Sequence, residues 1–403
     1  MSEPVLGKVK KTHKPQVAEY TLWQIVMYFL KLGTIGFGGP VALANYMHRD
    51  LVEQRKWISE DDYKDGLALA QLSPGPLAAQ LGIYLGYVHY SFIGATLVGI
   101  AFALPSFIMV VAIGWAYVQY GGLTWMQAVF YAVGASVIGI IAFSAYKLTT
   151  KTVGKKWLLI GIYLTSAIFT AVTESESIVL ILAGGIIVLL VKAPPQWLKN
   201  LKKGVNSIAV MPLAFAMAKA PSTVDTGLLW QIFWFFSKAG AFVFGSGLAI
   251  VPFLYSGVVV ENQWLNAQEF VDAVAVAMIT PGPVVITTGF IGYLLHGFSG
   301  ATIAAVATFL PAYLLTIIPA PLFKKYGKLP SISAFVEGVT TGAVGAITGA
   351  VIVLGQRSIY DIPTALFAIV TLGLLWKFKK ISEPIIILGA AVLGLIIYPL
   401  LHS

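Results

Sequence analysis

The chain has 403 residues, of which 58% are hydrophobic and 11% are charged, and its mean hydropathy is +0.84. This composition is far from that of soluble domains and indicates a membrane protein. The net charge of +9 would suggest nucleic acid for a soluble protein, but Lys and Arg stand mostly in short loops, so we expect them to set topology and expect no nucleic-acid partner. The absence of Cys excludes disulfides, thiol redox chemistry and thiolate metal sites.

Apolar runs long enough to cross a hydrocarbon core, which takes about 20 residues, occur in two series. The first series begins near Leu22, Tyr63, Phe92, Trp125, Trp157 and Ile178, and the second near Leu228, Phe270, Phe298, Ile332, Ile362 and Ile385. Continuous runs favour helices over the alternating strands of a membrane barrel. The first run lacks a small-residue cleavage site, so we expect no secretory signal. The sequence therefore predicts an all-α polytopic membrane protein.

The two series are copies of one another. Residues 22–89 pair without a gap with residues 229–296, which lie 207 residues later, and a one-residue slip then keeps Pro105 on Pro311. The paired residues include Lys31/Lys238 and His89/His296. We expect an N-terminal tail over residues 1–20, a first repeat over 21–203, a linker over 204–226 and a second repeat over 227–403.

Loop charges predict how the copies face the membrane, because short cytoplasmic loops are rich in Lys and Arg. Basic and uncharged or acidic loops alternate after a basic N-terminal tail, and the equivalent loops of the second copy have the reversed charge. This pattern predicts inverted repeats with a cytoplasmic N-terminus and an outside C-terminus. Inversion needs an extra crossing, for which residues 205–221 are the candidate, giving about thirteen spans. Two points stay open: the loop around Glu261 would be cytoplasmic without Lys or Arg, and residues 73–76 could re-enter instead of spanning.

Proline and glycine break two of the apolar runs at equivalent places, SPGP at residues 73–76 and TPGP at residues 280–283. Proline inside a helix removes a backbone donor, so each motif predicts the start of a half-helix, with Ser73 and Thr280 as N-caps. Such a start offers free N–H groups and the positive end of the helix dipole. If the repeats are inverted, both starts converge near the midplane and enclose an anion. The alternative is a plain proline kink.

Further polar and glycine positions belong to the candidate site. Lys31 and Lys238 lie about 15 Å inside their runs and need a polar cavity, an acidic partner or an anion. Clustered glycines at FGGP and FGSG allow unwound backbone or close helix packing. Gln71 and Gln80 could donate to an oxyanion or satisfy carbonyls of the broken helix. The full candidate set is Lys31, Gly38, Gly39, Gln71, Ser73, Pro74, Gly75, Pro76, Leu77, Gln80, Lys238, Gly245, Ser246, Thr280, Pro281, Gly282 and Pro283.

The order and spacing of FGGP, RKW (residues 55–57), SPGP, FGSG and TPGP resemble the chromate ion transporter family in its long-chain, two-domain form. The resemblance implies a multi-pass inner-membrane protein that exports chromate, confers chromate resistance and is driven by the membrane potential or proton gradient. The second copy departs from the pattern, with Ser246-Gly247 for Gly39-Pro40 and Thr287 for Gln80. We therefore expect the first half to make most substrate contacts.

Several alternatives to chromate export stay open at this point. Sulfate or another tetrahedral dianion is the second substrate, protons are candidate partners beside the lipid bilayer, and a passive anion channel would share the broken helices. The chain shows no clustered acid/base or metal motif, so we expect no enzyme activity and no cofactor. A homo-oligomer is compatible with the sequence.

Overall fold

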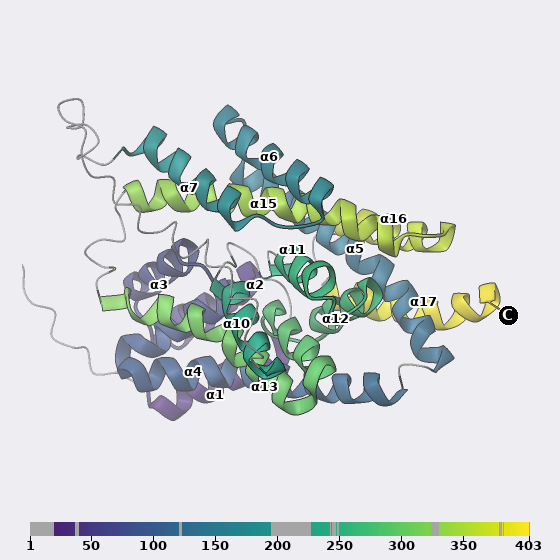
Figure 1. The fold of residues 1–403 in the computed structure, drawn as a ribbon. Helices are drawn as coiled ribbons and strands as arrows, with labels where there is room; N and C mark the ends of the chain where they lie inside the picture. The colour runs from purple at the N-terminus through teal and green to yellow at the C-terminus, as the bar shows by residue number, and fades with distance from the viewer. Residues whose placement is uncertain are drawn as a thin grey trace, which may run out of the picture.

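A computed structural model describes residues 20–36, 40–120, 123–194, 227–241, 243, 247, 250–321, 323, 330–378, 381 and 383–402. All regular elements in these segments are helices, which confirms the all-α prediction (Figure 1). The predicted linker, residues 204–226, and the predicted tail, residues 1–19, lie outside them.

The first repeat contains eight helical elements in the described part. These are α1 (Leu22–Ile35), α2 (Pro40–Met47), the π-helix η1 (His48–Gln54), α3 (Glu60–Leu72), α4 (Leu77–Tyr120), α5 (Thr124–Thr152), α6 (Trp157–Thr173) and α7 (Ile178–Lys192). A capping box starts α1: the N–H of Gln24 donates to Thr21 Oγ1, and the N–H of Thr21 donates to Gln24 Oε1 at 2.7 Å.

The second repeat has the same order of elements. They are α10 (Leu228–Ala241), α11 (Ile250–Tyr255), the π-helix η4 (Ser256–Glu261), α12 (Ala267–Ile279), the 3₁₀ turn η5 (Val284–Ile286), α13 (Thr287–Ile317), α15 (Pro330–Ser358), α16 (Ile362–Lys377) and α17 (Glu383–His402). Even a π-helix recurs at the same place, at η1 and η4.

Five segments of the described part are long and apolar enough to cross a membrane: Leu77–Tyr120, Thr124–Thr152, Val284–Ile317, Pro330–Ser358 and Glu383–Leu401. The other apolar helices are shorter. For example, α1 has 14 residues and is about 21 Å long, less than the ~30 Å hydrocarbon core. The expectation of thirteen full-length spans is therefore not confirmed.

The first apolar run does not cross the molecule but returns to the side on which it begins. The ring of Tyr20 stacks on Trp57 at 4.9 Å between centroids, and its hydroxyl bonds His89 Nδ1 at 2.8 Å. The chain thus leaves this end in α1, returns by Trp57, leaves again in α3 and returns by His89. Gly66 of α3 packs on the ring of Tyr84 in α4, so the two helices lie side by side. α1 with α2, and α3 with the part of α4 before its kink at Tyr90-Ser91, are therefore helical hairpins.

Both α4 and α13 contain a sharp kink, and the positions of the two kinks show which residues of the repeats are equivalent. The non-helical residues are Tyr90-Ser91 in α4 and His296-Gly297 in α13, which are 206 residues apart and not 207. The expected pairing of His89 with His296 is therefore wrong, and the one-residue slip occurs before the kink. The 3₁₀ turn η5 explains it, because three residues rising 2.0 Å each span about the same 6 Å as four α-helical residues.

Equivalent helices of the two repeats pack against each other in opposite chain directions. Thr96 Oγ1 of α4 bonds the Tyr313 hydroxyl of α13 at 2.6 Å. Further along α4, Phe107 contacts Phe298, with ring centroids 6.2 Å apart. Residue numbers rise along α4 as they fall along α13, so these two helices are antiparallel.

The long helices α5 and α15 exchange partners between the repeats. α15 packs on α6 and α7 of the first repeat, and α5 packs on α16 and α17 of the second (Figure 1). Glycines make these contacts close, since Gly338 lies against the backbone of Gly184, and Gly139 against that of Ala368. The repeats are interlocked rather than adjacent.

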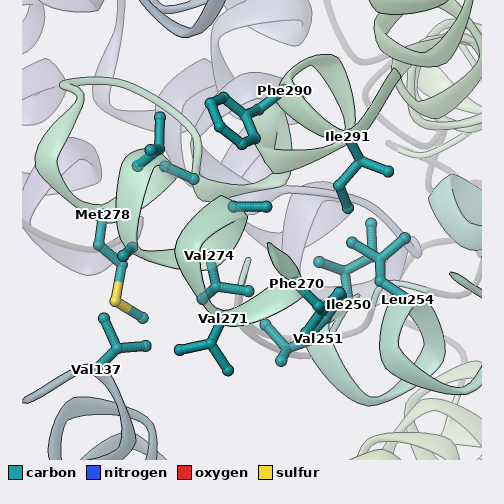
Figure 2. Close-up of a cluster of buried hydrophobic side chains, with 14 of the residues drawn as sticks. Val137, Ile250, Val251, Leu254, Phe270, Val271, Val274, Met278, Phe290 and Ile291 are labelled. Carbon is teal, nitrogen blue, oxygen red and sulfur yellow. The ribbon is translucent and has the colours of Figure 1, made fainter. Parts of the chain in front are cut away.

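The largest buried cluster forms around α12 of the second repeat. Figure 2 shows Met278 of this helix gathered with Val137 of α5, Leu254 of α11 and Phe290 of α13. Because helices of both repeats contribute, this core holds the second break at a defined position.

Candidate functional site

The two proline-glycine breaks are hydrogen-bonded across the repeats in equivalent ways. The N–H of Gly75 donates to the carbonyl oxygen of Val243 at 2.5 Å, and the N–H of Gly282 donates to that of Gly36 at 3.1 Å. Donors and acceptors are each 207 residues apart, so one bond is the counterpart of the other. Gly36 and Val243 follow α1 and α10, and the tips of the hairpins therefore meet at one place.

Glycine is required at the centre of both breaks. Gly75 has φ +140° and Gly282 has φ +97°, a region that side chains disfavour. A Cβ at Gly75 would lie 2.7 Å from the amide carbon of Gln80, and one at Gly282 would collide with Ser106 Oγ. These positions allow the backbone of one repeat to reach the other.

The predicted N-cap roles of Ser73 and Thr280 are wrong, because both residues end the preceding helix. Ser73 is the C-cap of α3 with ψ 141°, and Thr280 that of α12 with ψ 139°. A residue before proline is driven to this extended conformation, and the following prolines have no N–H to be capped. The hydroxyls bind carbonyls instead: Ser73 Oγ donates to Leu315 at 3.3 Å, and Thr280 Oγ1 to Ala277 at 3.1 Å.

The N–H groups expected to bind an anion are only partly available. Those of Gly75 and Gly282 are used by the bonds between the repeats, which contradicts that part of the prediction. α4 begins at Leu77 and η5 at Val284, directly after the breaks. First-turn N–H groups have no partner within their own helix, so these two starts still present donors and a positive dipole end.

Side chains satisfy the carbonyls that the breaks expose. Gln80 is fully buried, and its Nε2 donates to the Pro74 carbonyl at 2.8 Å. This is the second of the two roles that the sequence left open for Gln80. In the other break, Ser106 of the first repeat donates to the Pro281 carbonyl. Ser106 was missed by sequence reasoning because only the packing of α4 against the second break brings it there.

A cavity of about 40 Å³ lies between the hairpin tips. One water needs roughly 10–15 Å³ by this measure, so the space holds a few waters or one small ion. It is far below the ~300–1,000 Å³ of drug-sized ligand sites. The lining residues are Gly36, Pro40, Leu43, Pro76, Leu77, Ala78, Gly247, Ala277, Met278, Thr280, Gly282, Pro283, Val284, Glu383 and Pro384.

The predicted site residues divide into four groups. Pro76, Leu77, Thr280, Gly282 and Pro283 line the cavity. Ser73, Pro74, Gly75, Gln80 and Pro281 form or support the breaks without lining it. Gly38, Gly39, Gly245 and Ser246 lie outside the described residues.

The remaining three predicted residues do not line the cavity. Lys31 and Gln71 are exposed at the molecular surface, and Lys238 is half-buried. Two acids that could have been partners of these lysines have other partners: Glu337 pairs with Lys156 at 2.9 Å and also with Lys192, and Asp272 accepts from Tyr117 at 2.8 Å.

One residue of the described cavity lining, Glu383, is ionisable, and sequence reasoning missed it. It is the first residue of α17 and is followed by Pro384, which also lines the cavity. The available signal was an acid placed directly before a proline at the start of the last apolar run.

Comparisons with known proteins agree with this duplicated architecture. The chromate transporter family model matches residues 23–189 and again residues 230–395. The starts of the two matches are 207 residues apart, which confirms the internal duplication.

Similar proteins cover nearly the whole chain. The chromate transport protein of Cupriavidus metallidurans is 69% identical over 95% of both chains, and the probable chromate transport protein of Synechococcus elongatus is 64% identical over 94% of this chain and 96% of its own. The chromate transport protein of Pseudomonas aeruginosa is 30% identical over 93% of this chain and 92% of its own. No solved structure matches the chain. The chain therefore belongs to the chromate transporter family.

Proposed function

We propose that the protein is a secondary transporter that exports chromate across the cytoplasmic membrane and so confers chromate resistance. The observation that carries the proposal is the pair of equivalent breaks, bonded across the repeats around one ion-sized cavity. Anions are favoured where helix N-termini converge, and the starts of α4 and η5 both line this cavity. The names of the similar proteins supply chromate as the substrate.

The repeats are proposed to be inverted in the membrane, with the hairpins of each repeat entering from opposite faces. The antiparallel packing of α4 and α13 supports this orientation. The hairpins also remove the difficulty of loop charge. With Trp57 on the cytoplasmic side beside Tyr20, the basic Arg49 and Arg55 lie inside, and the loop around Glu261 lies outside.

The ion pairs support the same assignment of sides. Glu337 joins Lys156 and Lys192, which both belong to loops with cytoplasmic charge. Arg357 pairs with Glu174, and both belong to loops expected outside. The C-terminus falls on the outside, because Tyr398 contacts Gln127 near the start of α5 at 3.5 Å.

Sulfate is the second candidate substrate, because backbone N–H donors that are arranged to bind one tetrahedral dianion can also bind another. Chromate uptake into everted membrane vesicles, with and without a protonophore and with excess sulfate, tests export, coupling and selectivity together. Saturable uptake that stops with the protonophore is expected. Uptake that persists at full rate and does not saturate would instead indicate a passive channel.

A matched pair of variants tests the location of the site. Ala78 and Ala79 are neighbours on α4 and are each 3% exposed, but only Ala78 lines the cavity. Ala78→Leu should fill the cavity and abolish chromate uptake, while Ala79→Leu carries the same overpacking without filling it. Equal uptake by two equally abundant variants would place the site elsewhere.

A further inference from the structure

An acidic residue, Glu383, lines the cavity proposed for a dianion, although like charges repel. Glu383 contributes the ionisable side chain of the described lining, and the other lining residues are apolar or contribute hydroxyl and backbone groups. No hydrogen bond or salt bridge from a described residue reaches the Glu383 carboxyl, so it is not held in a structural ion pair as Glu337 is.

Few other charges face Glu383. α17 packs against α5 and α12. From α5, the exposed Lys147 is the basic group whose field reaches Glu383. From α12, the lining residues are the uncharged Ala277 and Met278, and Asp272 is bonded to Tyr117 and Gln268. The hairpin tips contribute no charged side chain to the described lining, and Lys379 and Lys380, just before α17, lie outside the described residues.

A dianion and an ionised carboxylate cannot share a cavity of this size without a counter-charge or a proton. Two like-charged groups in one site resolve the repulsion by holding a proton between them, as paired carboxylates do. Among the described residues, the basic group that acts on Glu383 is Lys147, which is exposed at the surface, so the proton is the available solution.

We propose that Glu383 and the bound oxyanion share one proton, which makes Glu383 both the proton site of the transporter and its determinant of selectivity for chromate over sulfate. The proton comes from solvent, forms an O–H···O bond between the carboxyl and an oxyanion oxygen, and returns to solvent on release. No other bond forms or breaks. This proposal rests on the proposed function of the cavity.

Selectivity follows from the basicity of the oxyanions. Chromate takes up a proton near neutral pH, whereas sulfate does so only in strong acid. Chromate is therefore the stronger acceptor for a shared proton, and a site that requires this bond prefers it. Backbone N–H groups alone give no such preference, because the two dianions have the same shape and charge.

Binding and protonation must then be linked. If each bound anion brings one proton with it, chromate affinity falls about tenfold per pH unit above the range where Glu383 is protonated in the empty cavity. The proton also travels with the anion, so the loaded carrier moves one negative charge fewer than a bare dianion would.

Calorimetric titration of the purified full-length protein with chromate tests the proposal. Titrations at slightly alkaline pH in two buffers of different ionisation enthalpy, neither an oxyanion, count the protons taken up. The wild type should take up about one proton per chromate and bind sulfate much more weakly. Glu383→Gln keeps the size and hydrogen-bonding ability of the side chain, and should lose proton uptake, flatten the pH dependence and let sulfate compete almost equally.

Two further variants keep the outcomes interpretable. Glu383→Asp retains an acid and should retain proton uptake at lower affinity. Glu269→Gln changes an acid that caps α12 away from the cavity, and should behave as wild type. Wild-type binding without proton uptake, or uptake that survives in Glu383→Gln, overturns the role of Glu383 and leaves the cavity standing. Chromate binding that is unaffected by Ala78→Leu overturns the cavity itself.

Discussion

At the scale of single residues, the central glycines connect the repeats and also limit what the site tolerates. Gly75 and Gly282 combine a positive φ with a backbone bond to the opposite repeat. Their N–H groups hold the fold together, and the N–H groups of Leu77 and Val284, two residues later because Pro76 and Pro283 have none, are the ones proposed for the ion. A change at either glycine therefore acts on both stability and transport.

Gly282→Ala should destabilise the protein more than Gly75→Ala. Both changes place a side chain at positive φ, which costs roughly 1–2 kcal/mol. At Gly282 the methyl group also collides with Ser106 Oγ, which is the closest of these contacts, whereas at Gly75 it meets the end of the Gln80 side chain and the Ala312 Cβ. Thermal unfolding of the purified proteins measures the order. Gly373→Ala is the control, because its Cβ would meet open space in the helix α16 and should be neutral or stabilising. Equal melting temperatures for all three variants would contradict the strain.

At the scale of elements, the prolines keep the backbone of each break extended. They thereby prevent the helices on either side of the break from joining into one continuous helix. Pro74 and Pro76 fix the backbone between α3 and α4, and neither can supply an N–H for a continuous helix. The same arrangement recurs at residues 280–283, where the first turn of the following helix is a 3₁₀ turn.

Replacing Pro74 and Pro76 together with Ala should abolish chromate uptake while the protein still inserts. The freed residues can join a helix, which withdraws the Gly75 N–H from the Val243 carbonyl and uses the first-turn donors of α4 in ordinary helical bonds. Pro399→Ala is the control, since Pro399 lies within α17 and does not line the cavity. The measurement is chromate uptake into vesicles, normalised to the amount of protein in the membrane. Wild-type uptake by the double variant would show that the motif is only a proline kink.

At the scale of the whole molecule, the duplication, the helical class and the positions of both breaks could be predicted from the sequence. They depend on composition and on residue types at a fixed interval, such as Pro74 and Pro281. The hairpins could not be predicted in the same way. A re-entrant run and a spanning run have the same hydropathy, and what separates them is a contact between distant residues, such as Tyr20 on Trp57.

The candidate site was predictable only in part, for a related reason. The motif residues are visible in the sequence, but their partners Ser106 and Glu383 come from helices whose positions depend on the interlocked packing of the repeats. The expected lysines are the converse case. The depth of Lys31 along its apolar run suggested a place in the site. Its side chain lies on an exposed face of α1, however, and only the packing of the helices decides which face is exposed.

The hairpin architecture predicts on which side of the membrane particular residues lie, and full-length spans predict the opposite sides. Single cysteines in this Cys-free chain at Glu53 and at Lys155 should react with a membrane-impermeant maleimide from the cytoplasmic side, and cysteines at Val260 and Tyr360 from the outside. Glu53 and Val260 are exposed, equivalent positions 207 residues apart, so opposite labelling reports the inversion of the repeats. Lys155 and Tyr360 are the references for each side. If α1 crossed the membrane completely, Glu53 would label with Tyr360 and Val260 with Lys155. That result would reject the hairpins and with them the meeting of four tips at one cavity.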